Sequence, residues 1–376
     1  MKKLTDICDI QYGYAFDSKC FTEDSSYPQL VRIRDVKKGY SETYYSGDYP
    51  EEYILSEDDL LVGMDGEFNI ARWKCSGALL NQRVCRLTAK VGTNEEYLRF
   101  AMSKSLKEIE QRTAFVTVKH LSAKELNKLE LDVPELSKQD KIADTLSRLE
   151  RVIESRQEEL EKLDDLIKAR FVEMFGNPLN GTAKFPIHQV GEVSNLVDPQ
   201  PSHRTPPVEE NGVPYVSIKD CDYKTGKIDF KGARKVSRKV LEEHLNRYTL
   251  HEGDFVIGKI GTIGNPVFVP ARDDYTLSAN VVLVQPDSEV VSPFFLKYSF
   301  ESDFVERQFV EAKNSTSQAA FGIQKVRTVE VMNPDLDVQR RFEKFVIQVD
   351  KSKVAVKKAL EQAQLLFDSL MQEYFG

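Results

Sequence analysis

The chain is an internal duplication, and this feature limits its possible folds more than any other. Short sequence patterns recur in the same order in both halves, with an offset that grows slowly along the chain. The matched segments are 30–35 with 215–220, 55–66 with 250–261, 98–101 with 296–299, 134–139 with 334–339, and 173–176 with 373–376. Because repeated sequences fold into similar units, we expect two similar domains that begin near Leu4 and Val190.

Each copy is predicted to end in a long helix that belongs to a coiled coil. No glycine or proline interrupts residues 139–175, and apolar residues recur there at alternating spacings of four and three, the pattern of a coiled-coil seam. The first seam consists of Ile142, Leu146, Leu149, Ile153, Leu160, Leu163, Ile167 and Met174, and the second of Phe342, Val346, Val349, Val356, Leu360, Ala363, Phe367, Leu370 and Tyr374. Arg156, Arg170 and Lys353 occupy the interrupted positions.

These helices are too long to pack only on their own domain. A helix of about 37 residues extends roughly 55 Å, farther than the diameter of a domain of its own size. The helix of the other copy is the available partner. Because a pseudo-twofold axis relates two copies within one chain, we expect the helices to pair antiparallel as a spacer between two unequal heads.

The remainder of each copy is predicted to be a β-rich head. Short strand-like runs, at 59–62, 84–87, 255–257 and 281–284, are separated by glycine, proline, asparagine and aspartate. Helical patterns near 97–112 and 294–309 add a helix to each head. The fold class is therefore α+β. The predicted organisation is a first head at 1–136, a helix at 137–178, a second head at 179–334 and a helix at 335–376.

Composition argues against several classes of protein. No run approaches the roughly 20 apolar residues of a membrane span, and Asp6 and Asp9 interrupt the region where a signal peptide would be apolar. The five cysteines are odd in number and include no C-x-x-C pair, which is typical of reduced thiols. We expect a cytoplasmic protein without disulfide bonds.

The sequence contains no strong catalytic or metal-binding motif. The five histidines are isolated, and the glycines within 258–264 lack the spacing of a phosphate-binding loop. We therefore expect no catalytic residue and no metal site. An acidic pair with a lysine, Asp287, Glu311 and Lys313, keeps a standalone metal-dependent nuclease as an alternative.

The charge of the chain is unevenly distributed. Its net charge of −8 argues against a simple polycation that coats nucleic acid, but residues 41–70 carry nine acids and no lysine or arginine. Basic tracts without acids lie at 68–94 and 230–241. Such tracts suit a surface that touches DNA phosphates at chosen places and reads base edges between them. The region between the first strand motif and the glycine-containing strand sums to −2 at 36–56 and +4 at 221–251, so the two heads should read different sequences.

Several repeated features together point to one family. They are the duplicated architecture, the helix starts with Pro134/Gln139 and Pro334/Gln339, the Phe-Gly ends at 175–176 and 375–376, and the run at 201–204 (PSHR). Over essentially the whole chain, this order resembles the specificity subunit of type I restriction-modification systems. The resemblance implies that each head is a target recognition domain that reads one half of a split, asymmetric DNA site. It also implies that the paired helices set the spacer, and that the subunit itself is not catalytic.

The same resemblance implies partners and cofactors. Two methyltransferase subunits would bind largely along the helices, and two restriction-translocase subunits would join the larger complex on double-stranded DNA. S-adenosylmethionine, ATP and magnesium would belong to those partners, with no cofactor bound by this chain.

Candidate DNA contacts are the polar and basic residues in loops around the repeated strands. They are Arg32, Arg34, Arg72, Gln82, Arg83, Lys119 and His120 in the first head, and Ser202, His203, Arg204, Lys219, Arg234, Lys235, Lys259 and Gln318 in the second. For partner binding we expect exposed apolar residues near the helix ends, Phe171, Phe175, Phe367 and Phe375, with helix packing as the alternative. A coiled-coil scaffold that joins two protein-binding heads is the alternative function without nucleic acid.

Overall fold

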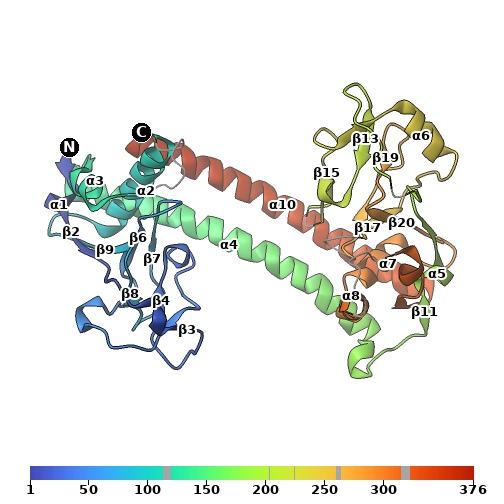
Figure 1. Cartoon of the computed structure of the whole chain (residues 1–376), viewed down its shortest axis with the longest axis horizontal. Coiled ribbons are helices and arrows are strands. Elements are labelled where there is room, and N and C mark those ends of the chain that lie inside the picture. Colours follow the sequence, from blue (N-terminus) through green and yellow to red (C-terminus); the bar gives the residue numbers. More distant parts are fainter. Residues whose placement is uncertain (113–119, 203, 224, 260–263, 315–321) are drawn as a thin grey trace. The chain divides into compact units, whose positions relative to one another are not determined.

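The computed structural model describes residues 1–112, 120–202, 204–223, 225–259, 264–314 and 322–376 (Figure 1). It mixes helices with short strands, which confirms the predicted α+β class. The chain divides into two compact units: unit 1 joins Met1–Glu158 to Lys357–Gly376, and unit 2 is Glu159–Val356. Each unit therefore contains one head and parts of both long helices. The division into four segments along the chain stays a prediction.

The head of unit 1 is built from short strands joined by helical turns and three helices. In chain order its elements are β1 (Lys2–Lys3), α1 (Leu4–Ile7), β2 (Cys8–Tyr12), η1 (Ser18–Cys20), β3 (Phe21–Thr22), β4 (Leu30–Val31), η2 (Ile33–Asp35), β5 (Tyr44–Tyr45), η3 (Glu51–Tyr53), β6 (Leu60–Gly63), β7 (Asn69–Arg72), β8 (Leu79–Leu80), β9 (Val84–Ala89), α2 (Glu95–Arg112), α3 (Ala123–Lys128) and β10 (Glu130–Leu131).

A four-stranded antiparallel sheet in the order β2-β9-β6-β7 forms the centre of this head. Its strand β6 is buried at every residue. Because successive side chains of a strand point to opposite sides, both faces of β6 are covered. Leu60 and Val62 pack with helices α1, α2 and α3, whereas Leu61 packs with Trp73 and Val31 on the other side. On that second side, β4 pairs in parallel with β8.

Unit 2 contains the second head. Its elements are η4 (Pro178–Asn180), β11 (Ile187–Gln189), α5 (Val190–Val193), β12 (Ser194–Val197), β13 (Val213–Val216), η5 (Ile218–Asp220), β14 (Cys221–Asp222), β15 (Lys227–Ile228), β16 (Arg234–Val236), α6 (Arg238–Leu245), β17 (Phe255–Gly258), β18 (Val267–Phe268), β19 (Thr276–Leu277), β20 (Val281–Pro286), α7 (Pro293–Phe300), α8 (Asp303–Asn314), α9 (Ile323–Arg327) and β21 (Glu330–Met332).

The second head repeats the topology of the first. Its four-stranded sheet has the order β12-β20-β17-β18, and a parallel pair, β13 with β19, again lies beside it. The register of the parallel pair is also the same, since Leu30 faces Leu79 in unit 1 as Tyr215 faces Thr276 in unit 2. The repeat that the sequence predicts is thus a repeat of strand pairing.

One predicted helix is wrong in detail. The pattern at 294–309 forms two helices, α7 and α8, instead of one. Helix α7 ends where the Glu301 backbone N–H bonds back to the Tyr298 carbonyl. The Ser302 carbonyl then accepts the first backbone hydrogen bonds of α8, and a serine before a helix is a typical start.

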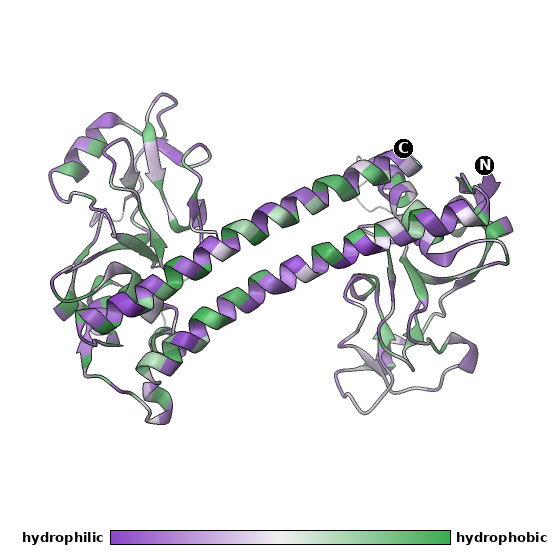
Figure 2. Cartoon of the chain, turned by 180° about the vertical axis from the view of Figure 1, so that it is seen from behind, coloured by the Kyte–Doolittle hydropathy of each residue, from purple (hydrophilic) through white to green (hydrophobic). Residues whose placement is uncertain are grey.

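Two long helices, α4 (Leu136–Phe175) and α10 (Leu336–Phe375), carry the predicted apolar seams, which Figure 2 shows as recurring hydrophobic residues. In unit 1 the start of α4, at Ile142 and Leu146, lies in one core cluster with the end of α10, at Phe367. In unit 2 the end of α4, at Ile167, shares a core with the start of α10, at Val346. Within each unit the helices therefore run antiparallel, as predicted.

The repeated glutamines explain how each long helix is fixed to its head. Gln139, 1% exposed, accepts a hydrogen bond from the Asn94 backbone N–H and donates to the carbonyls of Pro134 and Gly92. Gln339, fully buried, accepts from the Ser292 N–H and donates to the carbonyls of Pro334 and Val290, among others. Each glutamine thus satisfies buried backbone groups of the loop before α2 or α7 and of the turn that begins its own helix.

Candidate nucleic-acid interface

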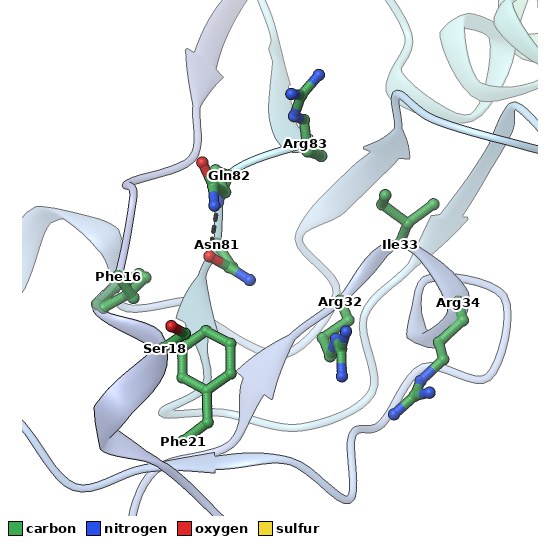
Figure 3. A pocket seen from close by; sticks show the side chains of 9 residues that line it. All are labelled: Phe16, Ser18, Phe21, Arg32, Ile33, Arg34, Asn81, Gln82 and Arg83. Atoms are coloured by element: carbon green, nitrogen blue, oxygen red, sulfur yellow. Dashed lines mark hydrogen bonds between the residues drawn. The ribbon is translucent and has the colours of Figure 1, made fainter. Parts of the chain in front are cut away.

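The carboxyl ends of the parallel strands β4 and β8 meet at one edge in unit 1. Strand β4 runs into residues 32–34, and β8 runs into residues 81–83. These six residues, together with Phe16, Ser18 and Phe21, line a hollow of about 430 Å³. Figure 3 shows Arg32 and Arg34 extending to one side, Arg83 to the other, and Asn81 and Gln82 between them. The structure therefore brings together four predicted DNA contacts: Arg32, Arg34, Gln82 and Arg83.

Local backbone chemistry fixes the arginine-bearing turn. Asp35, 3% exposed, accepts hydrogen bonds from the Arg32 backbone N–H and the Ser41 hydroxyl, which holds η2 closed. Asp220 accepts from the Ser217 N–H in the same way in unit 2. The exposed Arg32 and Arg34 also line a second hollow of about 720 Å³, whose rim includes Glu23 and Glu42. This wide, polar edge can accommodate a phosphate backbone next to base edges.

Arg83 is held by two groups from other elements. Its guanidinium Nη1 lies 3.5 Å from an oxygen of the Asp65 carboxylate and 3.0 Å from Nδ1 of His120. The same Nδ1 lies beside the Asp65 carboxylate, so it either accepts from Arg83 or, when it carries the proton, donates to Asp65. His120, predicted as a DNA contact, therefore lies beside the same edge and contacts Arg83.

The equivalent edge of unit 2 carries different residues. Strand β13 leads to residues 217–219 and β19 leads to residues 278–280, which correspond to 32–34 and 81–83. Lys219, predicted as a contact, is exposed at the position of Arg34. Asn280, also exposed, occupies the position of Arg83. Asn280 is not among the predicted contacts because it lies outside the basic tracts, although its place just before a repeated strand is a signal that could have indicated it.

Four further candidates of unit 2 lie on the segment between β12 and β13 or on strand β16. Ser202 and Arg204 are exposed, and both are held by the Gln200 amide, which donates to the Ser202 hydroxyl and the Arg204 carbonyl. Arg234 on β16 is half-buried and donates to the Pro206 carbonyl at 2.7 Å. Lys235 is exposed beside it. Arg234 thus holds the segment between β12 and β13, where Ser202 and Arg204 are exposed, while Lys235 is exposed on β16.

A chain of buried hydrogen bonds supports the same segment. His244 on α6, 3% exposed, contacts the Thr276 hydroxyl through Nδ1 and the Gln200 amide oxygen through Nε2. The Tyr248 hydroxyl contacts the Thr276 hydroxyl at 2.9 Å. Burial is the main cause that lowers the pKa of His244 below its ordinary value, so the ring is favoured in its neutral form.

Two predicted contacts lie away from exposed loop edges. Arg72 on β7 is bound by the carboxylates of Glu95 and Glu96. Lys259 is 4% exposed, with its ammonium 2.9 Å from the Asp198 carboxylate. Lys259 is therefore buried and does not lie on an accessible loop surface, as was expected of it, whereas Arg72 keeps 28% of its side chain exposed and has its charge paired within the head. Their position in basic tracts of the sequence could not reveal these acidic partners.

The predicted partner-binding phenylalanines divide into two groups. Phe171 and Phe175 are 5% and 0% exposed and pack against Phe295 and Phe342 in the core of unit 2. Their expected exposure is therefore wrong, and the packing alternative holds for them. Phe367 and Phe375 are partly buried against the core of unit 1, where Phe375 lies 5.3 Å from the ring of Tyr97. These two have some surface left at the end of α10.

Three predicted contacts, Lys119, His203 and Gln318, lie outside the described residues. The side chain of Lys313, one of the possible nuclease residues, lies outside them too. Of its companions, Glu311 pairs with Arg307. Within the described ranges, no cluster of three His, Cys, Asp or Glu side chains is placed to hold a metal ion. No helix of the same ranges is both long and apolar enough to cross a membrane.

Two solved structures have a similar fold. The S subunit of a type I restriction-modification system from M. genitalium gives a TM-score of 0.58 at 15% identity, covering 100% of this chain and 95% of that chain. A chain from a structure that concerns complex assembly of the type I restriction-modification system gives 0.54 at 16%, covering 100% and 96%.

Sequence comparisons agree with this likeness. The specificity subunit of type I restriction enzyme EcoBI from Escherichia coli is 28% identical over 400 residues, which is 99% of this chain and 84% of that protein. The specificity subunit of MjaVIII from Methanocaldococcus jannaschii is 21% identical over 84% of this chain and 77% of its own length. Residues 1–164 and 207–365 match the family described as Type I restriction modification DNA specificity domain. Because this match extends over both copies of the repeat, the chain belongs to the type I restriction-modification DNA specificity family.

Proposed function

We propose that this chain directs a type I restriction-modification complex to a two-part DNA site, with each head reading one half. The observation that carries the proposal is the repeated strand edge. Both heads present the carboxyl ends of a parallel strand pair in the same register, but with different residues at the matching positions. Two heads with the same strand pairing but different side chains at the strand edge suit recognition of two different half-sites.

The chemistry of the edges fits duplex DNA. Arg32, Arg34 and Lys219 offer exposed cationic donors for phosphate oxygens. The amides of Gln82 and Asn280 each offer a donor and an acceptor, and the guanidinium of Arg83 offers two parallel N–H donors. Groups of these kinds recognise base edges in the major groove. Phosphate contacts fix position and base contacts specify sequence, and each head contains both kinds of group.

Catalysis and cofactor binding belong, in this proposal, to partner subunits in the cytoplasm. Two methyltransferase subunits would bind S-adenosylmethionine, and restriction-translocase subunits would use ATP and magnesium. The half-buried aromatic residues Phe367 and Phe375 and the exposed apolar residues Val354, Leu365 and Leu366 of α10 are candidate contacts for them. The chain itself would supply DNA recognition and assembly.

The test is to produce the chain with its cognate methyltransferase subunit and to map methylated adenines by single-molecule sequencing. We expect one motif with two unlike half-sites and a fixed spacer. Binding of the complex to duplexes that carry this motif should weaken steeply with salt, because phosphate contacts release counterions. Methylation without such a motif would contradict the proposal. Absence of salt-dependent DNA binding by the complex would also contradict it and would favour the scaffold alternative. Magnesium-dependent cleavage by the isolated chain would instead support the nuclease alternative.

A further inference from the structure

The backbone of Arg83 is unusual. Its φ of +72° lies in the left-handed region, and among the described residues only Asp58 shares this feature without being a glycine. Arg83 occupies a turn closed by a hydrogen bond from the Val84 N–H to the Asn81 carbonyl. Glycine adopts this conformation without the steric cost that a side chain brings. Residues with such a backbone gather at functional sites, so this conformation, together with its place at the strand edge, makes Arg83 a candidate.

The side chain of Arg83 is contacted at one nitrogen, Nη1, and is half exposed. Its contacts are the Asp65 carboxylate and the ring of His120, yet 51% of the side chain is exposed. Asp65 and His120 are themselves joined by a β-bridge, and the Leu121 N–H donates to the Met64 carbonyl next to it. The Met64 N–H in turn donates to the Arg83 carbonyl. The anchoring groups and the arginine thus form one hydrogen-bonded assembly.

We propose that Arg83 is a specificity-determining residue that reads a guanine in the half-site bound by unit 1. This inference rests on the proposed function. A guanidinium pairs with O6 and N7 of guanine through two parallel N–H groups, which requires its plane to be fixed. Asp65 and His120 both contact Nη1 of Arg83, which restricts the position of the guanidinium and leaves the N–H groups of Nη2 and Nε for the base. A phosphate contact needs no such fixed plane, and Arg32 and Arg34 lie on the opposite side of the hollow for that role (Figure 3).

The matching position in unit 2 supports the assignment. Asn280 follows β19 as Arg83 follows β8, and it too is exposed. Its φ is not positive, so its turn differs. Asparagine pairs with N6 and N7 of adenine. The two heads therefore present different base-reading groups from one structural position.

The test compares the wild-type complex with variants Arg83→Gly and Arg83→Lys, each co-produced with the methyltransferase subunit. Glycine removes the guanidinium and suits the left-handed backbone, which offsets the larger entropy of glycine in the unfolded chain, so the variant should fold and assemble with a melting temperature near that of the wild type. Adenine-methylation maps should show one G·C position of one half-site becoming degenerate, with the other half-site and the spacer unchanged. A bidentate arginine discriminates between bases by about 5-fold to 150-fold, and binding to duplexes altered at that position should lose this preference.

The controls separate base reading from charge and from strain. Arg83→Lys keeps the charge but loses the two-pronged geometry, so discrimination should fall while salt dependence stays near that of the wild type. Asp58→Gly relieves the same kind of backbone at an exposed position of the same unit and should leave the motif unchanged.

Three results would overturn the role of Arg83: a wild-type motif that Arg83→Gly leaves intact, uniform weakening on all sequences, or an affected position without a G·C pair. Absence of any two-part motif for the wild-type complex would instead overturn the proposed function itself.

Discussion

The hydrogen bonds around His244 fit a neutral ring. The Gln200 amide nitrogen donates to Ser202 and to the Arg204 carbonyl, so its oxygen faces His244 and needs a donor there. His244 Nε2 therefore carries the proton, and Nδ1 accepts from the Thr276 hydroxyl. The Thr276 oxygen then accepts from Tyr248, whose own oxygen accepts from the Leu277 N–H. One directed chain joins strand β19 to the polar segment at 200–204.

This arrangement predicts that acid destabilises unit 2. Burial lowers the pKa of His244 in the folded chain, whereas the unfolded chain keeps the ordinary value near 6.5. Below about pH 6.5 the unfolded state thus binds a proton that the folded state resists, so the free energy of unfolding should fall, by at most about 1.4 kcal/mol per pH unit. Urea unfolding at pH 7.5 and 5.5 measures this loss.

The matched variants for that measurement are His244→Gln and His251→Gln. The first removes the titrating ring and should flatten the pH dependence, even if its stability at pH 7.5 is lower. The second replaces a histidine whose side chain is 66% exposed and controls for the loss of an imidazole elsewhere in unit 2. Equal slopes in all three proteins would show that another group causes the acid effect.

At the scale of elements, the starts of α4 and α10 depend on one buried glutamine each. Replacing Gln139 by leucine keeps a similar volume but leaves the Asn94 N–H and the carbonyls of Gly92 and Pro134 without this partner. Because a buried, unsatisfied polar group costs about 1–3 kcal/mol, we expect Gln139→Leu to lower the free energy of unfolding by about 2–4 kcal/mol. Urea titration monitored by circular dichroism measures this change.

The same substitution on the surface of α10 provides the control. Gln364 is exposed and donates to Asp368 one turn later. Gln364→Leu should change stability by no more than about 0.5 kcal/mol, as is usual for exposed positions. If Gln139→Leu were as mild as this control, water or a shifted loop would have to satisfy the freed groups, and the anchoring role would be refuted.

The sequence predicted the elements whose signal is local. The seams of α4 and α10 follow from spacing alone, since every third or fourth side chain lies on one helix face. The strands at β6, β9, β17 and β20 follow from short β-branched runs between turn residues. The repeat also indicated Gln139 and Gln339 without showing what they bind.

What the sequence could not show depends on contacts between distant residues. Leu30 and Leu79 pair in parallel, but the sequence around either residue contains no sign of this pairing. The sequence therefore could not show that Arg32 and Arg83 lie at one edge of the sheet. Lys259 and Arg72 looked like free cations because their acids lie at least 20 residues away in the chain. Phe171 was predicted to be exposed but is buried, because Phe295 in the second head packs against its ring.

At the scale of the whole molecule, the acidic net charge does not describe the surfaces that would meet DNA. Several acids of the segment 41–70 are paired with bases inside unit 1. Asp59 binds Arg86, Asp65 binds Arg83, and Glu67 binds Lys37. Arg32 and Arg34 remain exposed at the edge of β4. The charge that matters for DNA is therefore local, and it differs between the heads.

The long helices allow the spacer hypothesis to be tested by length. Helices α4 and α10 each contain 40 residues and run antiparallel within each unit. Inserting one heptad in both, with the seam continued, adds about 10 Å at 1.5 Å per residue. At about 3.4 Å per base pair, the preferred spacer should lengthen by roughly three base pairs while both half-sites stay the same. Methylation mapping of the co-produced complex reads the spacer and both half-sites at once.

A heptad in α4 alone serves as the control. Its seam would then no longer match that of α10, so we expect weaker stability and loss of methylation instead of a new spacer. If the double insertion folded and methylated with the original spacer, the helices would not set the distance between the half-sites. The heads would then have to be positioned on DNA by the methyltransferase subunits, and helix length would matter only for assembly.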